Sequence, residues 1–227
     1  MVSRPCRFES CHGHIINPII ILDNWIFFLI LTIMIESSRK TKDILVTVAR
    51  RLFAEKGFYG TTMNDIAVES NKGRRTLYTY FKSKDDIYMA VIQSECGRLS
   101  EMLKAVVDRK DLSPDEKLVE YIKVRMDAIK EIVMRNGELK AEFFLDVRRV
   151  ERVRRRLDFK EKNNLKEILR EGMDIGLFVR RDAEFTALAI HYALKGFETP
   201  YIRGEFDRIT LRKRELIIDT LMNGLRR

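Results

Sequence analysis

The sequence has little of what would interrupt a long helix. Only four of its 227 residues are prolines and eleven are glycines. This scarcity disfavours a turn-rich β fold and predicts an all-α protein. The three cysteines, Cys6, Cys11 and Cys96, are too few and too scattered for a disulfide framework. A reducing compartment, the cytoplasm, is therefore the expected location.

The signatures of catalysis are also missing. The sequence contains no glycine-rich phosphate loop, no nucleophile elbow and no paired metal motif, and His191 is the one histidine after the first forty residues. A lone histidine is more often structural than catalytic. Cys6, Cys11, His12 and His14 are ligand types that zinc accepts, but their spacing matches no standard zinc finger. We therefore expect no enzyme activity, no metal and no cofactor.

Positive charge is abundant and unevenly distributed. The net charge is +9, and residues 39–84 contain eleven Lys/Arg against four Asp/Glu, a net +7 in about one fifth of the chain. Such an excess suits a polyanionic partner, either nucleic acid or an anionic membrane surface. A basic surface that binds nothing is the alternative interpretation of the charge alone.

The first part of the chain is unusually apolar. Residues 15–34 have about the length that a membrane span needs, but two asparagines, a proline and an aspartate interrupt them. Three interpretations follow: the natural protein starts at Met34 and the preceding residues are upstream sequence read in frame, the extension is real, or it anchors the protein in a membrane. Residues 1–38 are treated as a separate N-terminal segment.

Apolar periodicity and capping signals predict helices along the rest of the chain. We expect Thr41 to cap the first helix and Gly57 to end it. Thr62, with Asp65 three residues later, resembles a capping box. The expected helices span about 41–58, 62–70, 74–81, 83–108, 113–136, 138–150, a charged segment that ends at Gly172 or Gly176, 182–197 and 209–225.

The stretch KGRRTLYTYF, residues 72–81, predicts a helix that contacts DNA. Leu77 and Phe81 fall on one side of a helical wheel, and Arg75 and Thr79 fall on the other. A short helix and the turn Asn-Lys-Gly precede this stretch, so residues 41–81 have the helix-turn-helix pattern. Arginine can form two hydrogen bonds to guanine in the major groove, and threonine and tyrosine can reach phosphates. A solvated helix with half-buried tyrosines is the alternative for the decapeptide alone.

The segment GFYGTTMNDIAVESNKGRRTLYTYFKSKDDIYMAVI resembles the DNA-binding signature of TetR-family (TetR/AcrR-type) transcriptional regulators. The shared positions are Gly-Phe, Thr-Thr, Asp-Ile-Ala, Thr-Leu-Tyr-x-x-Phe and Ser-Lys. Lys72 and Arg75 depart from the family pattern, which has a buried apolar residue and a small residue there. The resemblance implies that DNA is contacted by Thr62, Met63, Arg74, Arg75, Thr76, Tyr78, Tyr80 and Lys84.

The resemblance also implies a ligand-released homodimeric repressor, in which a three-helix DNA-binding domain (39–84) precedes a helical effector-binding and dimerisation domain (85–227). Its partners would be double-stranded operator DNA, a second copy of the chain and an unknown small-molecule effector. We expect the effector pocket to include Tyr121, Arg125, Phe143, Phe144, Met173 and Tyr192. The dimer seam would use Ala187, Ile190, Ala193, Leu194, Phe197, Leu216, Ile217, Thr220 and Leu221, unless these residues are buried within one chain.

Overall fold

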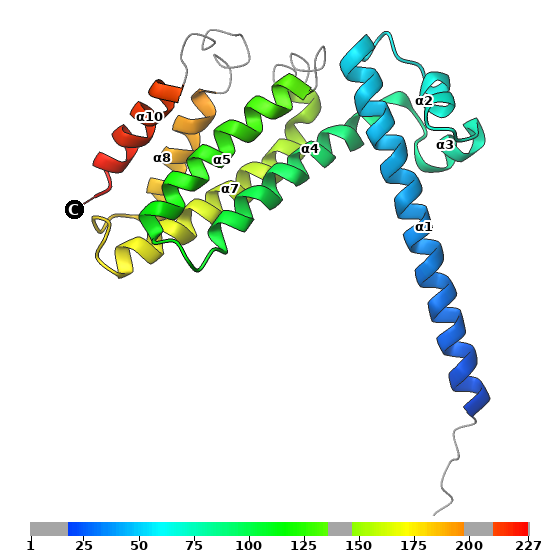
Figure 1. The fold of residues 1–227 in the computed structure, drawn as a ribbon, viewed down its shortest axis with the longest axis horizontal. Coiled ribbons are helices and arrows are strands. Elements are labelled where there is room, and N and C mark those ends of the chain that lie inside the picture. Colours follow the sequence, from blue (N-terminus) through cyan, green and yellow to red (C-terminus); the bar gives the residue numbers. More distant parts are fainter. Residues whose placement is uncertain (1–17, 136–146, 198–210, 227) are drawn as a thin grey trace, which may run out of the picture. The chain divides into compact units, whose positions relative to one another are not determined.

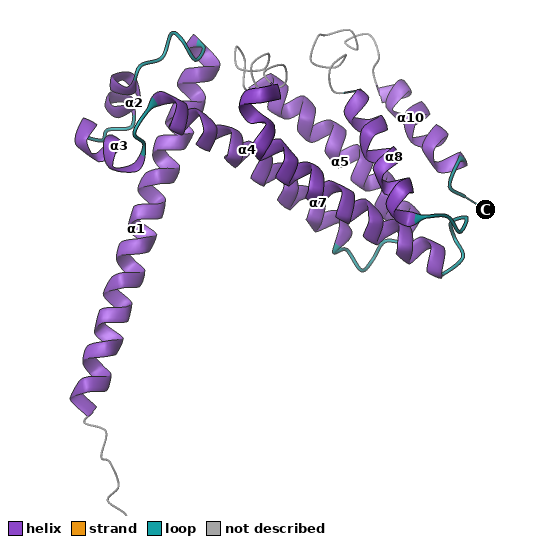
Figure 2. Cartoon of the chain, turned by 180° about the vertical axis from the view of Figure 1, so that it is seen from behind, coloured by secondary structure: helices purple, strands orange, loops and turns teal. Residues whose placement is uncertain are grey.

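The computed structural model describes residues 18–135, 147–197 and 211–226, and in these ranges the regular structure is entirely helical (Figures 1 and 2). Residues 1–43 and 44–227 form two compact units. The one β-type contact in the described ranges is an isolated bridge between Phe178 and Arg226. The expectation of an all-α fold is confirmed.

The first helix, α1, spans Pro18–Lys56 and begins much earlier than expected. The predicted start at Thr41 is wrong: the Thr41 hydroxyl donates a hydrogen bond to the Ser37 carbonyl, as a side chain inside a helix can do. Proline is well tolerated at the first helical position, and no further proline or glycine occurs before Gly57. The predicted end is confirmed, because Gly57 has φ +73° and donates its N–H to the Phe53 carbonyl.

The next three helices follow the sequence prediction closely. They are α2 (Met63–Glu69), α3 (Arg74–Tyr80) and α4 (Lys84–Val107). Thr62 and Ser83 are the N-caps of α2 and α4, and each forms a reciprocal capping box with an aspartate three residues later. Such caps each stabilise a helix by about 1 kcal/mol.

Four further helices are described in the remainder of the chain: α5 (Pro114–Arg135), α7 (Val147–Asp174), α8 (Ala183–Gly196) and α10 (Leu211–Asn223). The Asp182 side chain caps α8, as expected, by accepting hydrogen bonds from the main-chain N–H groups of Glu184 and Phe185. Most of the expected helix 138–150 lies outside the described residues, and residues 147–150 belong to α7.

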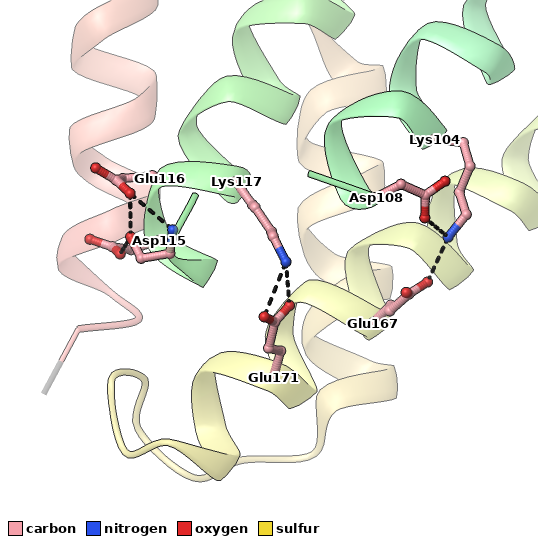
Figure 3. A network of polar contacts seen from close by, with 8 residues as sticks. Lys104, Asp108, Asp115, Glu116, Lys117, Glu167 and Glu171 are labelled. Atoms are coloured by element: carbon pink, nitrogen blue, oxygen red, sulfur yellow. Dashed lines mark hydrogen bonds and ion pairs between the residues drawn. The ribbon is translucent and has the colours of Figure 1, made fainter. Parts of the chain in front are cut away.

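The packing of these helices depends on α7, which contacts α4, α5 and α8, while α10 contacts α5. Leu103, Leu118, Leu165 and Ile168 are among the buried residues that fill the space between them. Ion pairs also join the same helices (Figure 3): the buried Lys117 on α5 donates to both carboxylate oxygens of Glu171 on α7, and the more exposed Lys104 on α4 donates to Glu167 on α7. The first turns of α4 also pack against α1 and the loop that follows it, because the Tyr88 ring lies edge-on to Phe53 and Phe58.

No helix in the described ranges is long and apolar enough to cross a membrane.

Candidate nucleic-acid interface

The helix-turn-helix is formed by α2, α3 and the turn between them. Asn71 in this turn has φ +52°, a left-handed conformation that asparagine tolerates better than most residues. Gly73 has φ −62° and ψ 145°, so it serves as the extended N-cap of α3 and not as the left-handed residue. The turn therefore depends on Asn71, and the Lys72 N–H closes it by donating to the Ala67 carbonyl.

One side of α3 is docked and the other is exposed, as the helical wheel predicted. Leu77 is fully buried and Phe81, directly after the helix, is 3% exposed. Arg74, Arg75 and Thr79 are exposed on the outer side. The Thr79 hydroxyl donates to the Arg75 carbonyl at 2.9 Å, which leaves the two guanidinium groups as the strongest donors of this surface.

The two tyrosines of α3 have different environments. Tyr78 is 44% exposed and can present its hydroxyl to a partner. Tyr80 is half-buried and packs against the core, as does Met63 at the start of α2. Thr76 is also half-buried. The exposed part of the predicted contact set is thus Thr62, Arg74, Arg75 and Tyr78.

An aromatic cluster holds this unit together below the exposed surface. The rings of Phe53, Phe58 and Tyr88 lie 5.2–6.0 Å apart between centroids, in tilted or edge-to-face pairs. Buried aromatic pairs of this geometry contribute about 0.5–1.5 kcal/mol each beyond their burial. Thr61 is fully buried beside them and donates its hydroxyl to the carbonyls of Leu52 and Gly57.

Lys84, which the resemblance assigns to phosphate, makes internal contacts. Its ammonium donates to the carbonyls of Phe58 and Thr61, at 2.7 and 2.8 Å, and lies 4.4 Å from the centre of the Phe58 ring. These contacts tie the start of α4 to the loop between α1 and α2. Two of the three ammonium donors are used in this way.

The start of α2 combines a cap with an exposed side chain. The Thr62 main-chain N–H and hydroxyl both donate to Asp65, at 2.8 and 2.7 Å. The hydrogen bonds from Thr62, first the side-chain bond and then the main-chain bond, hold the pKa of Asp65 below its ordinary value. The carboxylate therefore stays ionised near neutral pH and holds Thr62, the exposed N-cap of α2, in place.

Sequence reasoning missed one strongly exposed aromatic residue shortly before the start of α2, Tyr59. It is 84% exposed and stands edge-on to Phe58, at 5.4 Å between ring centroids. Tyr59 lies in the loop between α1 and α2, between Gly57 and Gly60. A Cβ at Gly60 would lie 2.3 Å from the Lys56 carbonyl oxygen, so the loop is tight and pushes the tyrosine outward. The signal in the sequence is a pair of aromatic residues, Phe58 and Tyr59, between two glycines.

The predicted pocket residues do not gather at one place. Tyr121 and Arg125 on α5 are buried together, and Arg125 Nε donates to Glu161 Oε2 on α7 at 3.0 Å. Met173 is buried elsewhere and lines a groove along α7. Tyr192 is 59% exposed on α8. Phe143 and Phe144 lie outside the described residues.

A buried polar cluster that no sequence pattern predicts surrounds Glu161. His191 on α8 places Nδ1 3.1 Å from Glu161 Oε2, and the exposed fractions of both side chains are 2% or less. Burial alone would raise the pKa of Glu161, but the positive charge of Arg125 and the hydrogen bond from His191 outweigh it, so the pKa lies below its ordinary value. Burial raises the pKa of the Tyr121 phenol. The cluster joins α5, α7 and α8 through one carboxylate.

The residues predicted for the dimer seam divide into two groups. Ala187, Ile190 and Leu194 of α8 are buried within the described chain, which corresponds to the alternative that the sequence left open. The residues Ala193, Leu216 and Thr220 are exposed, and Phe197, Ile217 and Leu221 are half-buried.

Comparisons with known proteins agree with this geometry. The family described as bacterial regulatory proteins, tetR family, matches residues 45–91. An uncharacterized HTH-type transcriptional regulator in the lacX 3′ region of Lactococcus lactis is 33% identical over 84 residues, which cover 37% of this chain and 43% of that protein. This chain therefore matches less than half the length of that relative.

Solved structures extend the likeness to most of the described fold. A transcriptional regulator from Cytophaga hutchinsonii superposes with a TM-score of 0.69 at 18% identity, covering 82% of this chain and 98% of that one. The regulator FadR from Bacillus subtilis, solved with stearoyl-CoA, superposes with a TM-score of 0.62 at 19% identity, covering 80% and 97%. At these identities the superpositions establish the fold.

Proposed function

We propose, from the premise that this chain belongs to the TetR family of bacterial helix-turn-helix transcriptional regulators, that it is a transcriptional repressor. In this proposal the protein binds double-stranded operator DNA as a homodimer in the cytoplasm, and a small effector releases it from the DNA. The family is one of regulators and not of enzymes, which agrees with the absence of catalytic motifs in the sequence. Each part of the proposal has its own support in the structure.

The observation that carries DNA binding is the division of α3 into two faces. Leu77 fixes the helix to the core, while Arg74 and Arg75 extend into solvent at its N-terminal end. Neither arginine makes an ion pair within the described ranges, so both are available to phosphates or to guanine edges. A recognition helix reads the major groove with the residues of its N-terminal part, which is where the two arginines lie.

Exposed apolar side chains on α8 and α10 support the homodimer. Tyr192 and Leu216 are 59% and 64% exposed, and Ala193, next to Tyr192, and Thr220, one turn after Leu216, are exposed as well. Large exposed apolar side chains are typical of interfaces. Two subunits would carry two copies of α3, which must sit about 34–36 Å apart to reach successive major grooves.

The polar cluster around Glu161 supports effector release. The FadR relative was solved with stearoyl-CoA, so a protein of this fold holds a small molecule. In this chain Glu161 Oε1 is buried and has no hydrogen-bond partner in the described ranges, although Oε2 contacts Arg125 and His191. A buried polar atom without a partner costs about 1–3 kcal/mol. We therefore expect a molecule that donates to Oε1 to bind where α5, α7 and α8 meet and to shift these helices relative to one another. Because α4 contacts α7 and also holds Phe53 of α1 and the loop before α2 through Tyr88 and Lys84, such movement would change the spacing of the two α3 helices.

A gel-shift titration with the upstream region of the protein's own gene tests the proposal. We expect retarded complexes whose binding constant falls steeply with salt, because each neutralised phosphate contributes about 0.9 to the slope of log K against log salt. A slope near zero would show that phosphate neutralisation plays no part, and the proposal would then be wrong.

A further inference from the structure

A groove of about 680 Å³ runs along α7 and the first turn of α8. No residue of α2 or α3 lines it. This volume falls in the range of small-molecule sites. Its floor is apolar, with the buried side chains of Met173 and Ala187. The groove has no part in the DNA-binding function proposed above, and its lining shows what it could bind.

Cations dominate the rim of the groove. Lys162, Lys166 and Arg170 recur every four residues on α7, so they form one row with steps of about 6 Å along the helix. Arg180 and Arg181, from the loop between α7 and α8, complete the set. Three carboxylates also line the groove, which leaves it with a net positive charge.

Two of those three carboxylates are already engaged. Asp182 accepts the capping hydrogen bonds of α8, at 2.8 and 3.0 Å. Glu184 lies 3.4 Å from Lys166 Nζ. Lys162, Arg170 and the two loop arginines make no ion pair with any residue in the described ranges, and the five cations of the groove exceed its three carboxylates by two. Unpaired cations this close together repel one another, and a polyanion would relieve that repulsion.

Two exposed phenylalanines stand beside the cations. Phe159 on α7 is 63% exposed and Phe185 on α8 is 69% exposed, and both line the groove. Phenyl rings exposed beside Lys and Arg form surfaces on which flat rings stack while phosphates pair with the cations. Phe159 and Arg170 are eleven residues apart on α7, about 16 Å along the helix, which is the length of a small ligand.

We propose that this groove binds a small organic polyanion that carries a flat ring, of the nucleoside di- or triphosphate class. The phosphates would lie along Lys162, Lys166 and Arg170, and the base would stack on Phe185 or Phe159. The proposal does not depend on DNA binding, because the groove contains no residue of the helix-turn-helix.

Isothermal titration of the full-length protein with ATP tests the proposal. Two partial probes separate its components, since adenosine lacks the phosphates and tripolyphosphate lacks the base. We expect ATP to bind once per chain and each partial probe to bind at least tenfold more weakly. If ATP binds no more tightly than tripolyphosphate, the groove merely attracts charge and the proposal is overturned; equal binding of adenosine, or no binding of ATP, overturns it as well.

Variants then locate the binding. Lys166→Glu/Arg170→Glu should weaken ATP binding at least tenfold, whereas Arg156→Glu/Lys160→Glu, which makes the same charge change at exposed positions of α7 outside the groove, should not. Arg180→Glu/Arg181→Glu is a second groove variant in a loop, should the first fail to fold. Equal weakening by groove and control variants would overturn the proposal.

Two further results separate the site from the rest of the molecule. Arg74→Ala/Arg75→Ala should leave ATP binding unchanged, and a loss of ATP binding in that variant would place the anion on α3 instead and overturn the proposal. Light scattering of Lys166→Glu/Arg170→Glu should show the same mass in solution as the wild type. A change from dimer to monomer would show that a second copy of the chain occupies the groove, which also overturns the proposal.

Discussion

The ammonium of Lys84 lies 2.7 Å from the carbonyl oxygen of Phe58 and 4.4 Å from the centre of the same residue's ring, so one side chain at the start of α4 holds the loop that follows α1. The resemblance to the family assigned Lys84 to a DNA phosphate. The structure shows a residue whose charge is largely used inside the protein.

Lys84→Met should therefore act on stability more than on the salt dependence of DNA binding. Hydrogen bonds from a charged group are worth about 1.5–3 kcal/mol, so we expect a clearly lower unfolding temperature. Lys82→Met, two residues earlier and exposed, is the matched control and should leave stability unchanged. A slope of log K against log salt that falls by about 0.9 in Lys84→Met, with no thermal effect, would restore the phosphate assignment.

Gly172 on α7 should not tolerate a side chain. A Cβ there would lie 2.2 Å from Cδ2 of Phe178, whose ring is 1% exposed and cannot move into solvent without leaving the core. We expect Gly172→Ala to destabilise the protein by about 1–3 kcal/mol, measured by urea unfolding. Gly97→Ala in α4 has nothing within 4 Å of the new Cβ and should stabilise the protein by up to about 1 kcal/mol. The same sign for both substitutions would contradict this interpretation of the packing.

The buried carboxylate of Glu161 should make stability depend on acid pH. Its pKa in the folded protein is below the ordinary value of 4.5, so the ionised form stabilises the fold above that pH. This contribution should be lost as the pH falls through the folded-state pKa. Glu161→Ala, which removes the buried carboxylate to which Arg125 Nε donates, should cost about 3–5 kcal/mol at pH 7. The cost should shrink as the pH falls through the folded-state pKa of Glu161, which lies below the ordinary value.

Unfolding of wild type and variant by urea at several pH values measures this difference. Glu167→Gln is the control, since Glu167 is an exposed carboxylate on the same helix that pairs with Lys104. A Glu161→Ala cost that stayed constant from pH 7 to pH 3 would show that the charge of Glu161 contributes nothing.

The dimer proposal predicts that charge on the exposed apolar residues of α8 and α10 separates the subunits. Tyr192→Glu/Leu216→Glu should convert a dimer into a monomer in light scattering, because two carboxylates would lose their water in the interface. Ile175→Glu is the control: Ile175 is 65% exposed but lies in the turn after α7. A dimer that survived in the double variant would place the interface elsewhere.

Local signals in the sequence predicted the helix-turn-helix in detail. The capping signal at Thr62 and the expected start at residue 83 predicted two helix starts, the Asn-Lys-Gly sequence predicted the turn, and the spacing of Leu77 and Phe81 predicted the buried face of α3. All of these depend on residues within four or so positions of one another, where spacing and propensity decide the conformation.

What the sequence could not show depends on contacts between distant residues. Lys84 reaches carbonyls 23 and 26 residues earlier, and Arg125 pairs with a carboxylate 36 residues later. No periodicity reports such pairs, because they exist only after the helices pack. The start of α1 was missed for another reason: Thr41 is a good cap, but the residues before it contain no helix breaker after Pro18.

The recognition surface of α3 is tested most directly by selecting the preferred operator from a random DNA library and measuring its affinity for wild type and for Arg74→Ala/Arg75→Ala at one salt concentration. Arg180→Ala/Arg181→Ala, an adjacent arginine pair exposed after α7, is the control. Each base-contacting arginine is worth about 1–3 kcal/mol, so the α3 variant should bind the operator at least about thirtyfold more weakly than the wild type. It should also no longer distinguish the operator from scrambled DNA. The control variant should keep the affinity and the selectivity of the wild type. If the α3 variant retained wild-type affinity and selectivity, these two arginines would not be the residues that read the operator.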